Sequence, residues 1–411
     1  MNLTREFAVL ALLAAATLLA AAPIAKADIV SDWNVRASEI VGPPSLDTPT
    51  SNRVLAIMHT AVYEAVNAIT KRYPSGGFKI DAPVGASVDA AVAAASRATL
   101  SKLAPLKQAE VDSAYQEAIA KIPEGTSKTD GIGVGEKAAA AILGSRMEDG
   151  FSTIETYRPY TIAGVYVPTV VPLVSQWPSR KPWLMTSASQ FRPGPPPKLT
   201  SEAWARDYNE IKALGRKTNS TRTAEQTDIA RFWETTGASI YHGIVRSITD
   251  RPGRDVTQNA RLFMAVTQAA DDAIIAVFDA KYHYNFWRPI TAIRNGDIDG
   301  NDATERDASW TPFINTPMHP EYPCAHCISS AAIGTVLEAE IGNGPVPVLA
   351  TMSPTANNAK RTWMKVEDFI QEVSNGRICD GVHFRTSTEV GTAMGRQVGK
   401  LAVAKYLQPV K

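Results

Sequence analysis

The chain has 411 residues, of which 45% are hydrophobic and 20% are charged, so it can bury a large apolar core. Its formal net charge is +1, which excludes a general electrostatic attraction to nucleic acid or to an anionic membrane surface. Any anion binding must therefore come from a local cluster of cations.

The first 27 residues are predicted to form a cleaved export signal. Arg5 gives a charged start, an apolar run follows from Phe7 to Ala22, and Ala25-Lys26-Ala27 has the small-x-small pattern of a signal-peptidase site. The alternative is a membrane anchor, but the run is short for a span of about 20 residues. We expect cleavage before Asp28, a secreted or periplasmic location, and no stable membrane insertion after cleavage.

Four helices are predicted in the N-terminal half, because apolar residues recur there at helical spacing. The clearest is 52–73, where Val54, Ile57 and Met58 begin a buried face and Ser51 is the expected N-cap. The other three ranges are 87–103, 110–122 and 135–147.

An irregular, proline-rich stretch is predicted to follow these helices. Nine prolines lie between Pro159 and Pro197, which excludes a regular helix. A linker between two domains is one interpretation. However, Trp177, Trp183 and Leu184 would be unfavourable in a solvated linker. A long loop packed on the surface of one domain is therefore favoured.

Helical spacing resumes in the C-terminal half, and neither a series of strands nor an internal repeat is apparent. The predicted helices are 201–214, 223–250, 257–281, 326–341, 359–374 and 386–406, with a second irregular stretch over 288–323. We therefore predict an all-α fold. After the signal at 1–27, a single helical-bundle domain with long Pro-rich loops would span 28–411, divided into an N-terminal helical half of about 28–200 and a catalytic half of about 201–411.

Three segments of the C-terminal half combine cations with histidines. The first holds Lys281 and Arg288, the second holds His326, and the third holds Arg377 and His383. Two guanidinium groups and one ammonium group suit a tetrahedral or trigonal oxyanion such as phosphate or vanadate. A helix that begins at His326 would add free N–H groups. One histidine could bond to the central atom while the other moves a proton at an apical oxygen.

Each of these pieces alone is a weak signal. A Lys and an Arg seven residues apart usually lie on a solvated helix face, and a lone His is more often structural than catalytic. Cations on an otherwise apolar element are costly unless they meet a partner. The combination of the three segments therefore predicts an oxyanion pocket.

The order of these motifs resembles the signature shared by the vanadium-dependent haloperoxidases and the type 2 phosphatidic acid phosphatase/bacterial acid phosphatase superfamily, in particular the secreted bacterial haloperoxidase-like branch. That signature reads Lys-x6-Arg-Pro, then Pro-Ser-Gly-His, then Ser-Arg-x5-His. The first motif matches fully over 281–289, the second matches at Pro323 and His326, and the third matches at Arg377 and His383. The resemblance spans residues 281 to 383.

The resemblance implies a role for each matched position. The groups expected to hold the equatorial oxygens of a vanadate cofactor are Lys281, Arg288 and Arg377, and Cys324 and Ala325 are further positions expected to bind that cofactor. His383 would be the axial ligand to vanadium, or the nucleophile if the protein is a phosphatase. His326 would be the general acid/base near the apical oxygen.

The second motif departs from the signature, because Cys324 and Ala325 replace Ser and Gly. A thiol is a poorer hydrogen-bond donor than a hydroxyl, and peroxide can oxidise it. Cys327 and Cys379 are the other cysteines. Three states are open: a disulfide from Cys379 to Cys324 or Cys327, three reduced thiols, or a zinc site. Gly376 also replaces the Ser of the third motif.

Two further residues are candidates for a halide site. His319 lies five residues before Cys324, and in the resembling family an aromatic residue there goes with chloride oxidation while His goes with bromoperoxidases. Bromide is therefore the expected halide. The alternative is that His319 only bonds within the loop 315–321. Trp287 is expected at the pocket mouth.

Three functions are open. The favoured one is a vanadium-dependent haloperoxidase, an oxidoreductase that uses hydrogen peroxide to oxidise a halide to hypohalous acid, with an organic acceptor. The alternative is a secreted acid phosphatase that acts on a phosphate ester through a phosphohistidine, without vanadate. The third is a non-enzymatic oxyanion-binding protein, against which two placed histidines argue. No nucleic-acid partner is expected. Oligomerisation is left open, because family members often form oligomers but no interface is readable here.

Overall fold

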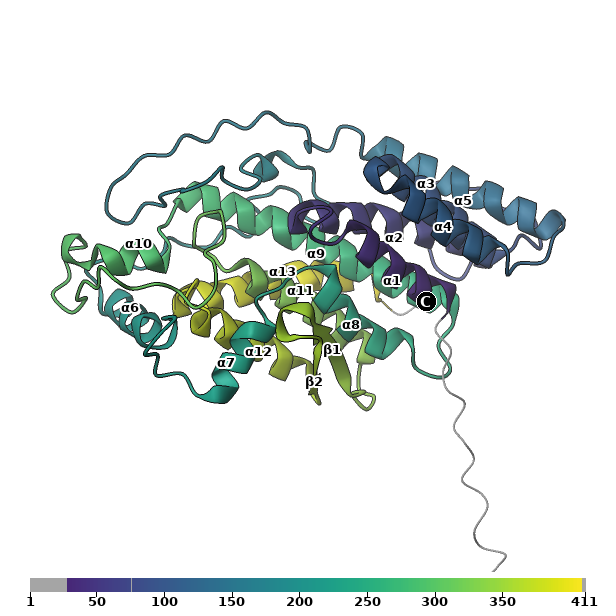
Figure 1. Ribbon diagram of the computed structural model, residues 1–411. Helices are drawn as coiled ribbons and strands as arrows, with labels where there is room; N and C mark the ends of the chain where they lie inside the picture. The colour runs from purple at the N-terminus through teal and green to yellow at the C-terminus, as the bar shows by residue number, and fades with distance from the viewer. Residues whose placement is uncertain (1–27, 75, 409–411) are drawn as a thin grey trace, which may run out of the picture.

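The computed structural model describes residues 28–74 and 76–408, and the expected all-α class is confirmed. The predicted export signal, residues 1–27, lies outside the described residues. Within the described part, no helix is long and apolar enough to cross a membrane. The helices of both halves of the chain pack around one long helix, α9 (Val256–Tyr284) (Figure 1).

Helix α9 is the centre of the core, because it is apolar on nearly all sides and such a helix must be surrounded by protein. The side chain of Asp255 caps its first turn, and Asn285, in a left-handed conformation with φ of 48°, ends it. Its neighbours include α2 (Thr48–Thr70), α11 (Ala325–Ile341) and α13 (Arg385–Tyr406). The Lys281 side chain therefore leaves α9 in its last, buried turn.

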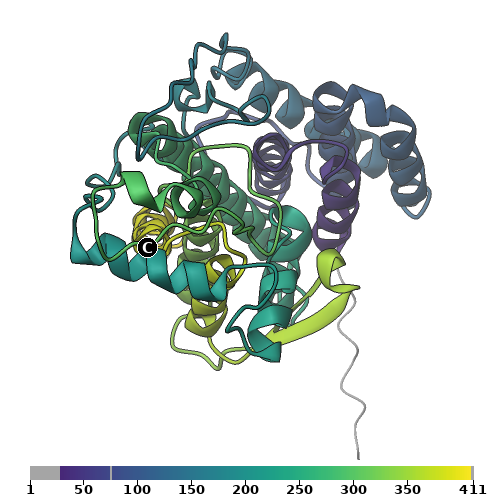
Figure 2. The same ribbon diagram turned by 60° about the vertical axis from the view of Figure 1, so that its left-hand side comes forward.

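The N-terminal helices form one group beside α9. In addition to α2, they are α1 (Ile29–Val41), α3 (Val88–Leu103), α4 (Gln108–Ile119) and α5 (Thr126–Ser145), with the short 3-10 turn η1 (Pro105–Lys107). Figure 2 shows this purple-to-blue group on one side of the molecule and the green-to-yellow C-terminal helices on the other. One hydrophobic cluster includes residues of both groups, from Val30 to Ala402.

The remaining elements lie in the C-terminal half, except the 3-10 turn η2, which lies in the proline-rich stretch. They are α6 (Glu202–Leu214), α7 (Ala224–Phe232), α8 (Ala238–Thr249), α10 (Pro289–Arg294) and α12 (Val366–Cys379), the strands β1 (Leu349–Ser353) and β2 (Ala359–Trp363), and the 3-10 turns η2 (Trp177–Ser179), η3 (Gly296–Ile298) and η4 (Pro354–Ala356). The strands pair antiparallel, with Leu349 opposite Trp363.

Two predicted helices of this half are wrong in part. The range 223–250 is two helices, because the chain turns between Phe232 and Ala238 and Gly237 there has a φ of +87°. The range 359–374 begins as strand β2, which pairs with β1 through a turn in which Asn357 and Asn358 take positive φ. Over so short a segment, alternating apolar and polar residues are compatible with the repeat of a helix and with the repeat of a strand.

In the N-terminal half, one helix was missed and two others begin earlier than predicted. The missed helix is α1. Helix α2 begins at Thr48 rather than after Ser51, because the side chain of Asp47 accepts from the backbone N–H of Thr50 and caps the helix. Helix α5 begins nine residues before the predicted start at 135.

Small residues bring α13 close to α11. Gly391, Gly395 and Gly399 lie at intervals of four residues and face α11, and a Cβ added to Gly391 would lie 2.6 Å from the carbonyl oxygen of Cys324. This packing joins the two helices whose N-terminal ends carry the second and third motifs. It therefore fixes the position of His326 relative to His383.

The proline-rich stretch is packed on the body, as predicted, and Trp177 within it is fully buried. Three carboxylates of α9 hold this stretch. Arg180 donates to both oxygens of Asp271 at 2.6 and 3.0 Å, and Arg192 donates to both oxygens of Asp279 at 2.7 Å. Asp272 accepts from the backbone N–H groups of residues 183–185. Charged side chains on an apolar helix are thus explained by ion pairs to the loop.

A buried polar cluster joins α1, α2 and α8 away from the three motifs. The amide of Asn34 contacts His59 Nε2 at 3.0 Å and His242 Nδ1 at 2.8 Å, and Arg246 donates to the Asn34 oxygen. His59 is stacked on Phe263 and fully buried, and this burial lowers its pKa to about 3. His59 is therefore neutral in the folded protein at neutral pH.

This histidine is expected to make the protein acid-sensitive. Its folded pKa lies below the ordinary value near 6.5, so its stabilising contribution is complete above pH 6.5 and falls as the pH drops toward 3, by about 1.4 kcal/mol per pH unit. His59→Phe should make the free energy of unfolding depend less on pH, measured by urea denaturation between pH 6.5 and 4.5. The same change at the exposed His283 should leave the slope unaltered. Equal slopes for wild type and His59→Phe would contradict the assignment.

Candidate active site

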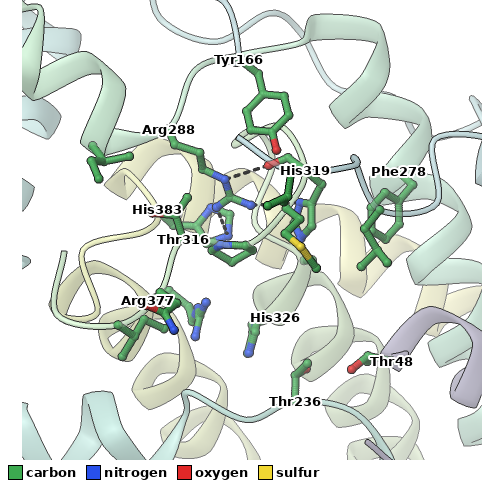
Figure 3. Close-up of a pocket in the computed structure, with 18 of the residues that line it drawn as sticks. Thr48, Tyr166, Thr236, Phe278, Arg288, Thr316, His319, His326, Arg377 and His383 are labelled. Atoms are coloured by element: carbon green, nitrogen blue, oxygen red, sulfur yellow. Dashed lines mark hydrogen bonds between the residues drawn. The ribbon is translucent and has the colours of Figure 1, made fainter. Parts of the chain in front are cut away.

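The three motif segments meet at a cavity of about 640 Å³ near the C-terminal end of α9 (Figure 3). Six of the predicted site residues line it: Arg288, His319, Ala325, His326, Arg377 and His383. Among the described residues that line the cavity, three predicted site residues are not found: Lys281, Cys324 and Trp287. Four of the lining side chains form a basic floor of two arginines and two histidines, and they come from the residue before α10, from α11, from α12 and from the segment before α13.

Arg288 occupies the centre of this floor. It precedes α10, is fully buried, and donates to the carbonyl oxygens of His319 and Val382, each at 2.8 Å. Its terminal nitrogens also contact His383 Nε2 at 3.3 Å and His319 Nδ1 at 3.0 Å. Burial lowers its pKa to about 10, and the neighbouring Arg377 acts in the same direction. Arg288 remains a cation that joins the second and third motifs.

The tautomer of His383 follows from its partners. Its Nδ1 lies 2.8 Å from the Glu321 carboxylate, which accepts hydrogen bonds, whereas its Nε2 lies beside the Arg288 guanidinium, which can only donate. Nδ1 therefore carries the proton and Nε2 presents a lone pair. Burial holds the pKa of His383 well below its ordinary value, followed by the charges of Arg288 and Lys281. A neutral, correctly oriented nitrogen is what bonding to a central atom requires.

A glycine turn sets the spacing between Arg377 and His383. Gly381 has a φ of +82°, and a Cβ added there would clash with the carbonyl oxygen of Gly215. Only glycine fits this position without strain. The turn reverses the chain after α12, so that Arg377 and His383 face the same cavity.

Lys281 lies behind the cavity rather than in its lining. Its ammonium group is buried and donates to the carbonyl oxygens of Pro320 and Glu321 at 2.9 and 2.7 Å. Burial lowers its pKa, and Arg288 and Arg377 lower it further. In this arrangement Lys281 holds the backbone of the second motif in place, instead of reaching into the cavity as the motif alone suggested.

His326 and Arg377 complete the floor. His326 is the second residue of α11, and burial, then Arg377, lower its pKa well below the ordinary value. Arg377 donates to the Trp233 carbonyl oxygen at 2.9 Å and pairs with Asp380 at 2.5 Å. Burial raises the pKa of Asp380 to about 7. Across residues 28–74 and 76–408, no hydrogen-bond partner is found for buried Arg377 Nε or for His326 Nε2.

These features fit an oxyanion such as vanadate. Arg377 lowers the pKa of both Lys281 and Arg288, and Arg288 lowers that of Lys281. Within the described part of the chain, these three cations lie beside only two buried carboxyl groups, those of Glu321 and Asp380. Buried donors and acceptors without partners are costly, and a ligand that uses Arg377 Nε and His326 Nε2 would remove that cost. The donor set combines guanidinium forks with a free imidazole nitrogen, as a bound oxyanion needs.

The cysteines depart from the predicted pairing. Cys324 and Cys327 form a disulfide, and Cys379 is free and buried. The predicted bond to Cys379 is therefore wrong, as is the alternative of three reduced thiols. Cys324 caps α11, its sulfur accepting from the Cys327 N–H at 3.2 Å. A sulfur used in this way is not available to a cofactor or to zinc.

A thiol count tests this assignment. Unfolded, non-reduced protein is expected to react with one equivalent of a thiol reagent, from Cys379, and with three equivalents after reduction. Burial raises the pKa of Cys379 to about 11, so the folded protein should react slowly. Three equivalents without reduction would contradict the disulfide.

Trp287 is not at the pocket mouth. It is buried and stacked on Trp204 with ring centroids 5.9 Å apart, within a second hydrophobic cluster. The cavity instead receives side chains that no motif indicated, including Tyr166, Glu234 and Thr236. Glu234 and Thr236 lie in the break between α7 and α8, which the sequence pattern predicted as continuous helix.

His319 lines the cavity next to Arg288. His319 Nδ1 lies 3.0 Å from the Arg288 guanidinium, which can only donate, and 3.2 Å from the Pro320 carbonyl oxygen, which can only accept. The Arg288 contact is shorter and comes from a charged donor, so we assign the proton of a neutral His319 to Nε2. The ring meets Phe278 edge-on, with centroids 5.1 Å apart. Burial keeps the pKa of His319 well below its ordinary value. His319 thus contacts Pro320 within the loop 315–321, as the alternative expected, and also Arg288 outside that loop.

The fold and the floor of the cavity together define a helical protein with a buried oxyanion site. Residues 261–411 match a family described as the VCPO second helical-bundle domain. The structure is similar to that of a bacterial vanadium-dependent iodoperoxidase, with a TM-score of 0.78 and 24% identity, over 92% of this chain and 96% of that one. A holo-type bacterial vanadium-dependent chloroperoxidase gives a TM-score of 0.70 and 17% identity, over 93% and 98% of the two chains.

A curated relative agrees with these structures. Vanadium chloroperoxidase from Curvularia inaequalis is 24% identical over 383 aligned residues, which cover 72% of this chain and 62% of the relative. The chain thus spans less than two thirds of that relative's length. The resemblance to the vanadium-haloperoxidase superfamily, predicted from the three motifs, is confirmed, and the chain has the helical-bundle fold of that superfamily.

Proposed function

We propose that the chain is a vanadate-dependent haloperoxidase that uses hydrogen peroxide to oxidise a halide. The observation that carries this proposal is the buried floor of Arg288, His326, Arg377 and His383, which lines one cavity. In this floor Arg377 Nε and His326 Nε2 have no hydrogen-bond partner among the described residues. When bound, vanadate would supply a Lewis-acidic centre that activates peroxide for two-electron oxidation of the halide.

Each residue of the floor would have a separate role in this reaction. His383 Nε2 has the lone pair that would hold the central atom, and Arg288 and Arg377 would neutralise the oxygens. His326 is neutral because burial lowers its pKa, so its Nε2 can accept a proton from hydrogen peroxide. The four side chains are themselves shielded from solvent, which strengthens each of these interactions.

Bromide is the halide that we propose as the preferred substrate. An N–H group on His319 Nε2, beside the edge of Phe278, would be a donor for a large, weakly hydrated anion. The similar proteins include chloroperoxidases and an iodoperoxidase, so all three halides belong in the assay. His319→Phe should reduce the rate with bromide more than the rate with iodide, which is easier to oxidise.

The size of the cavity supports a bound organic acceptor. At about 640 Å³ it is within the range of sites for drug-sized ligands and far larger than an oxyanion and a halide require. Much of the lining outside the floor is apolar and includes Val167, Leu173, Ile274, Ile290 and Met318. A small apolar organic molecule would be the acceptor that this lining fits.

The decisive assay compares metal-free protein with and without orthovanadate. Bromination of monochlorodimedone with hydrogen peroxide should appear only with vanadate. The same preparation is tested for hydrolysis of nitrophenyl phosphate. Hydrolysis that vanadate inhibits, without bromination, would replace the proposal by the phosphatase alternative, with His383 as nucleophile. Inertness in both assays despite tight phosphate binding would leave an oxyanion-binding protein.

We further propose that the protein is exported and that its mature form begins at Asp28. The side chain of Asp28 accepts from the backbone N–H of Ser31 at 2.9 Å and caps α1, so cleavage before Asp28 would keep that cap. The intact mass of protein recovered from the periplasm or culture medium should correspond to residues 28–411. A mass that includes the first 27 residues would contradict this proposal.

A further inference from the structure

Glu321 is a buried carboxylate beside the basic floor that no part of the three-motif pattern requires. It lies two residues before Pro323, and its side chain is fully shielded from solvent. Burying a carboxylate is costly unless it is paired and hydrogen-bonded. The contacts of Glu321 therefore indicate what the residue does.

Three polar groups of Glu321 meet different parts of the site, whereas no hydrogen-bond partner is found for its Oε2 among the described residues. Its Oε1 accepts from His383 Nδ1 at 2.8 Å and from the backbone N–H of Phe384 at 3.0 Å. Its carbonyl oxygen accepts from Lys281 at 2.7 Å, and its N–H donates to the Phe286 carbonyl oxygen at 2.9 Å. Glu321 is thereby held against His383 by the segments of the first and third motifs.

The contacts of the two ring nitrogens, with Glu321 and with Arg288, determine which His383 nitrogen carries the proton. With Nδ1–H directed at Glu321, Nε2 faces Arg288 as a lone pair. The other tautomer would set an N–H against the Arg288 guanidinium and a lone pair against the carboxylate, so both contacts would become repulsive. Glu321 and Arg288 therefore favour the same tautomer from opposite sides of the ring.

We infer that Glu321 is a positioning residue for His383, which holds the ring with Nε2 free to bond the central atom of an oxyanion. This inference rests on the proposed function for the identity of that oxyanion, vanadate. Carboxylate partners of ligating histidines fix the tautomer and raise the basicity of the bonding nitrogen, and their loss typically lowers affinity by about 10- to 100-fold. Glu321 itself touches neither oxyanion nor substrate.

The test compares Glu321→Leu with Glu321→Gln by two measurements. Leu removes both hydrogen bonds, whereas the Gln oxygen can still accept from His383 Nδ1 and Phe384, and its amide can donate to the nearby Ser387 hydroxyl. Glu340→Leu is the control, because its side chain is also buried but pairs with Arg254 and Arg261 instead. Nitrogen-15 NMR of histidine-labelled protein, with His383 assigned by its loss in His383→Gln, reports the tautomer. Orthovanadate titration reports affinity.

Wild type should show His383 protonated on Nδ1. Glu321→Leu should lose this signature and bind orthovanadate about 10- to 100-fold more weakly, while Glu321→Gln keeps the signature and recovers most of the affinity. Glu340→Leu should match wild type in both. A wild-type His383 protonated on Nε2, or a Glu321→Leu protein with unchanged tautomer and affinity, would overturn the inference.

The two measurements also separate this inference from the proposed function. If wild type shows the Nδ1 tautomer and Glu321→Leu loses it, the positioning role stands even where no form of the protein binds orthovanadate. In that case it is the vanadate assignment that fails. The wild-type spectrum remains decisive if Glu321→Leu does not fold.

Discussion

His383→Ala is expected to abolish vanadate-dependent halide oxidation, with a loss on the order of 1,000-fold or more, as when a residue that bonds the reacting group is removed. The change removes the Nε2 lone pair beside Arg288 and leaves the Glu321 carboxylate without its main partner. Orthovanadate affinity should fall together with the rate. The measurement is the rate of bromide oxidation as a function of orthovanadate concentration.

A matched variant makes this result specific. His283 lies in the last turn of α9 but is exposed and does not line the cavity. His283→Ala should therefore keep the wild-type rate. Circular dichroism should show that His383→Ala remains folded. A folded His383→Ala protein that retains a tenth of the wild-type rate would rule out His383 as the vanadium ligand.

The largest loss of stability is expected from Arg180→Ala. Arg180 is fully buried and bonds Asp271 at 2.6 and 3.0 Å and Asp149 at 3.2 Å. Removing one partner of a buried ion pair leaves an uncompensated charge, at a cost of about 3–5 kcal/mol. The proline-rich loop should loosen from α9, which would be seen as new protease cleavage sites between 150 and 200.

An exposed ion pair gives the comparison. Arg36 pairs with Glu117 at 2.7 Å, and both side chains are substantially exposed. Arg36→Ala should therefore cost no more than about 1 kcal/mol. Both free energies of unfolding come from urea denaturation. A cost below about 1 kcal/mol for Arg180→Ala would mean that apolar contacts alone hold the loop.

The sequence predicted the helices and the basic floor better than the rest of the site. Long apolar stripes such as that of α9 leave few alternatives to a buried helix, and Arg288, His326, Arg377 and His383 were recognisable from their spacing. The break between α7 and α8 was not recognisable from the sequence. The pattern on both sides of Trp233 and Gly237 is helical, and so short an interruption does not by itself indicate that a helix ends. Glu234 and Thr236 were missed for the same reason.

Other residues could not be assigned from the sequence, because their roles depend on contacts between distant segments. Glu321 meets His383 across 62 positions of the chain. The direction of the Lys281 side chain depends on where the backbone of the second motif passes. The disulfide joins the two cysteines that are closest in the sequence, Cys324 and Cys327, instead of the predicted pair with Cys379. Both lie on one turn at the start of α11.

The most direct test of the account is a titration of metal-free protein with orthovanadate, followed by the rate of bromide oxidation at saturating hydrogen peroxide. The account predicts no rate without vanadate, a rise that saturates at one vanadate per chain, and competition by phosphate for the same site. A rate that does not respond to vanadate, or no halide oxidation at any vanadate concentration, would contradict it.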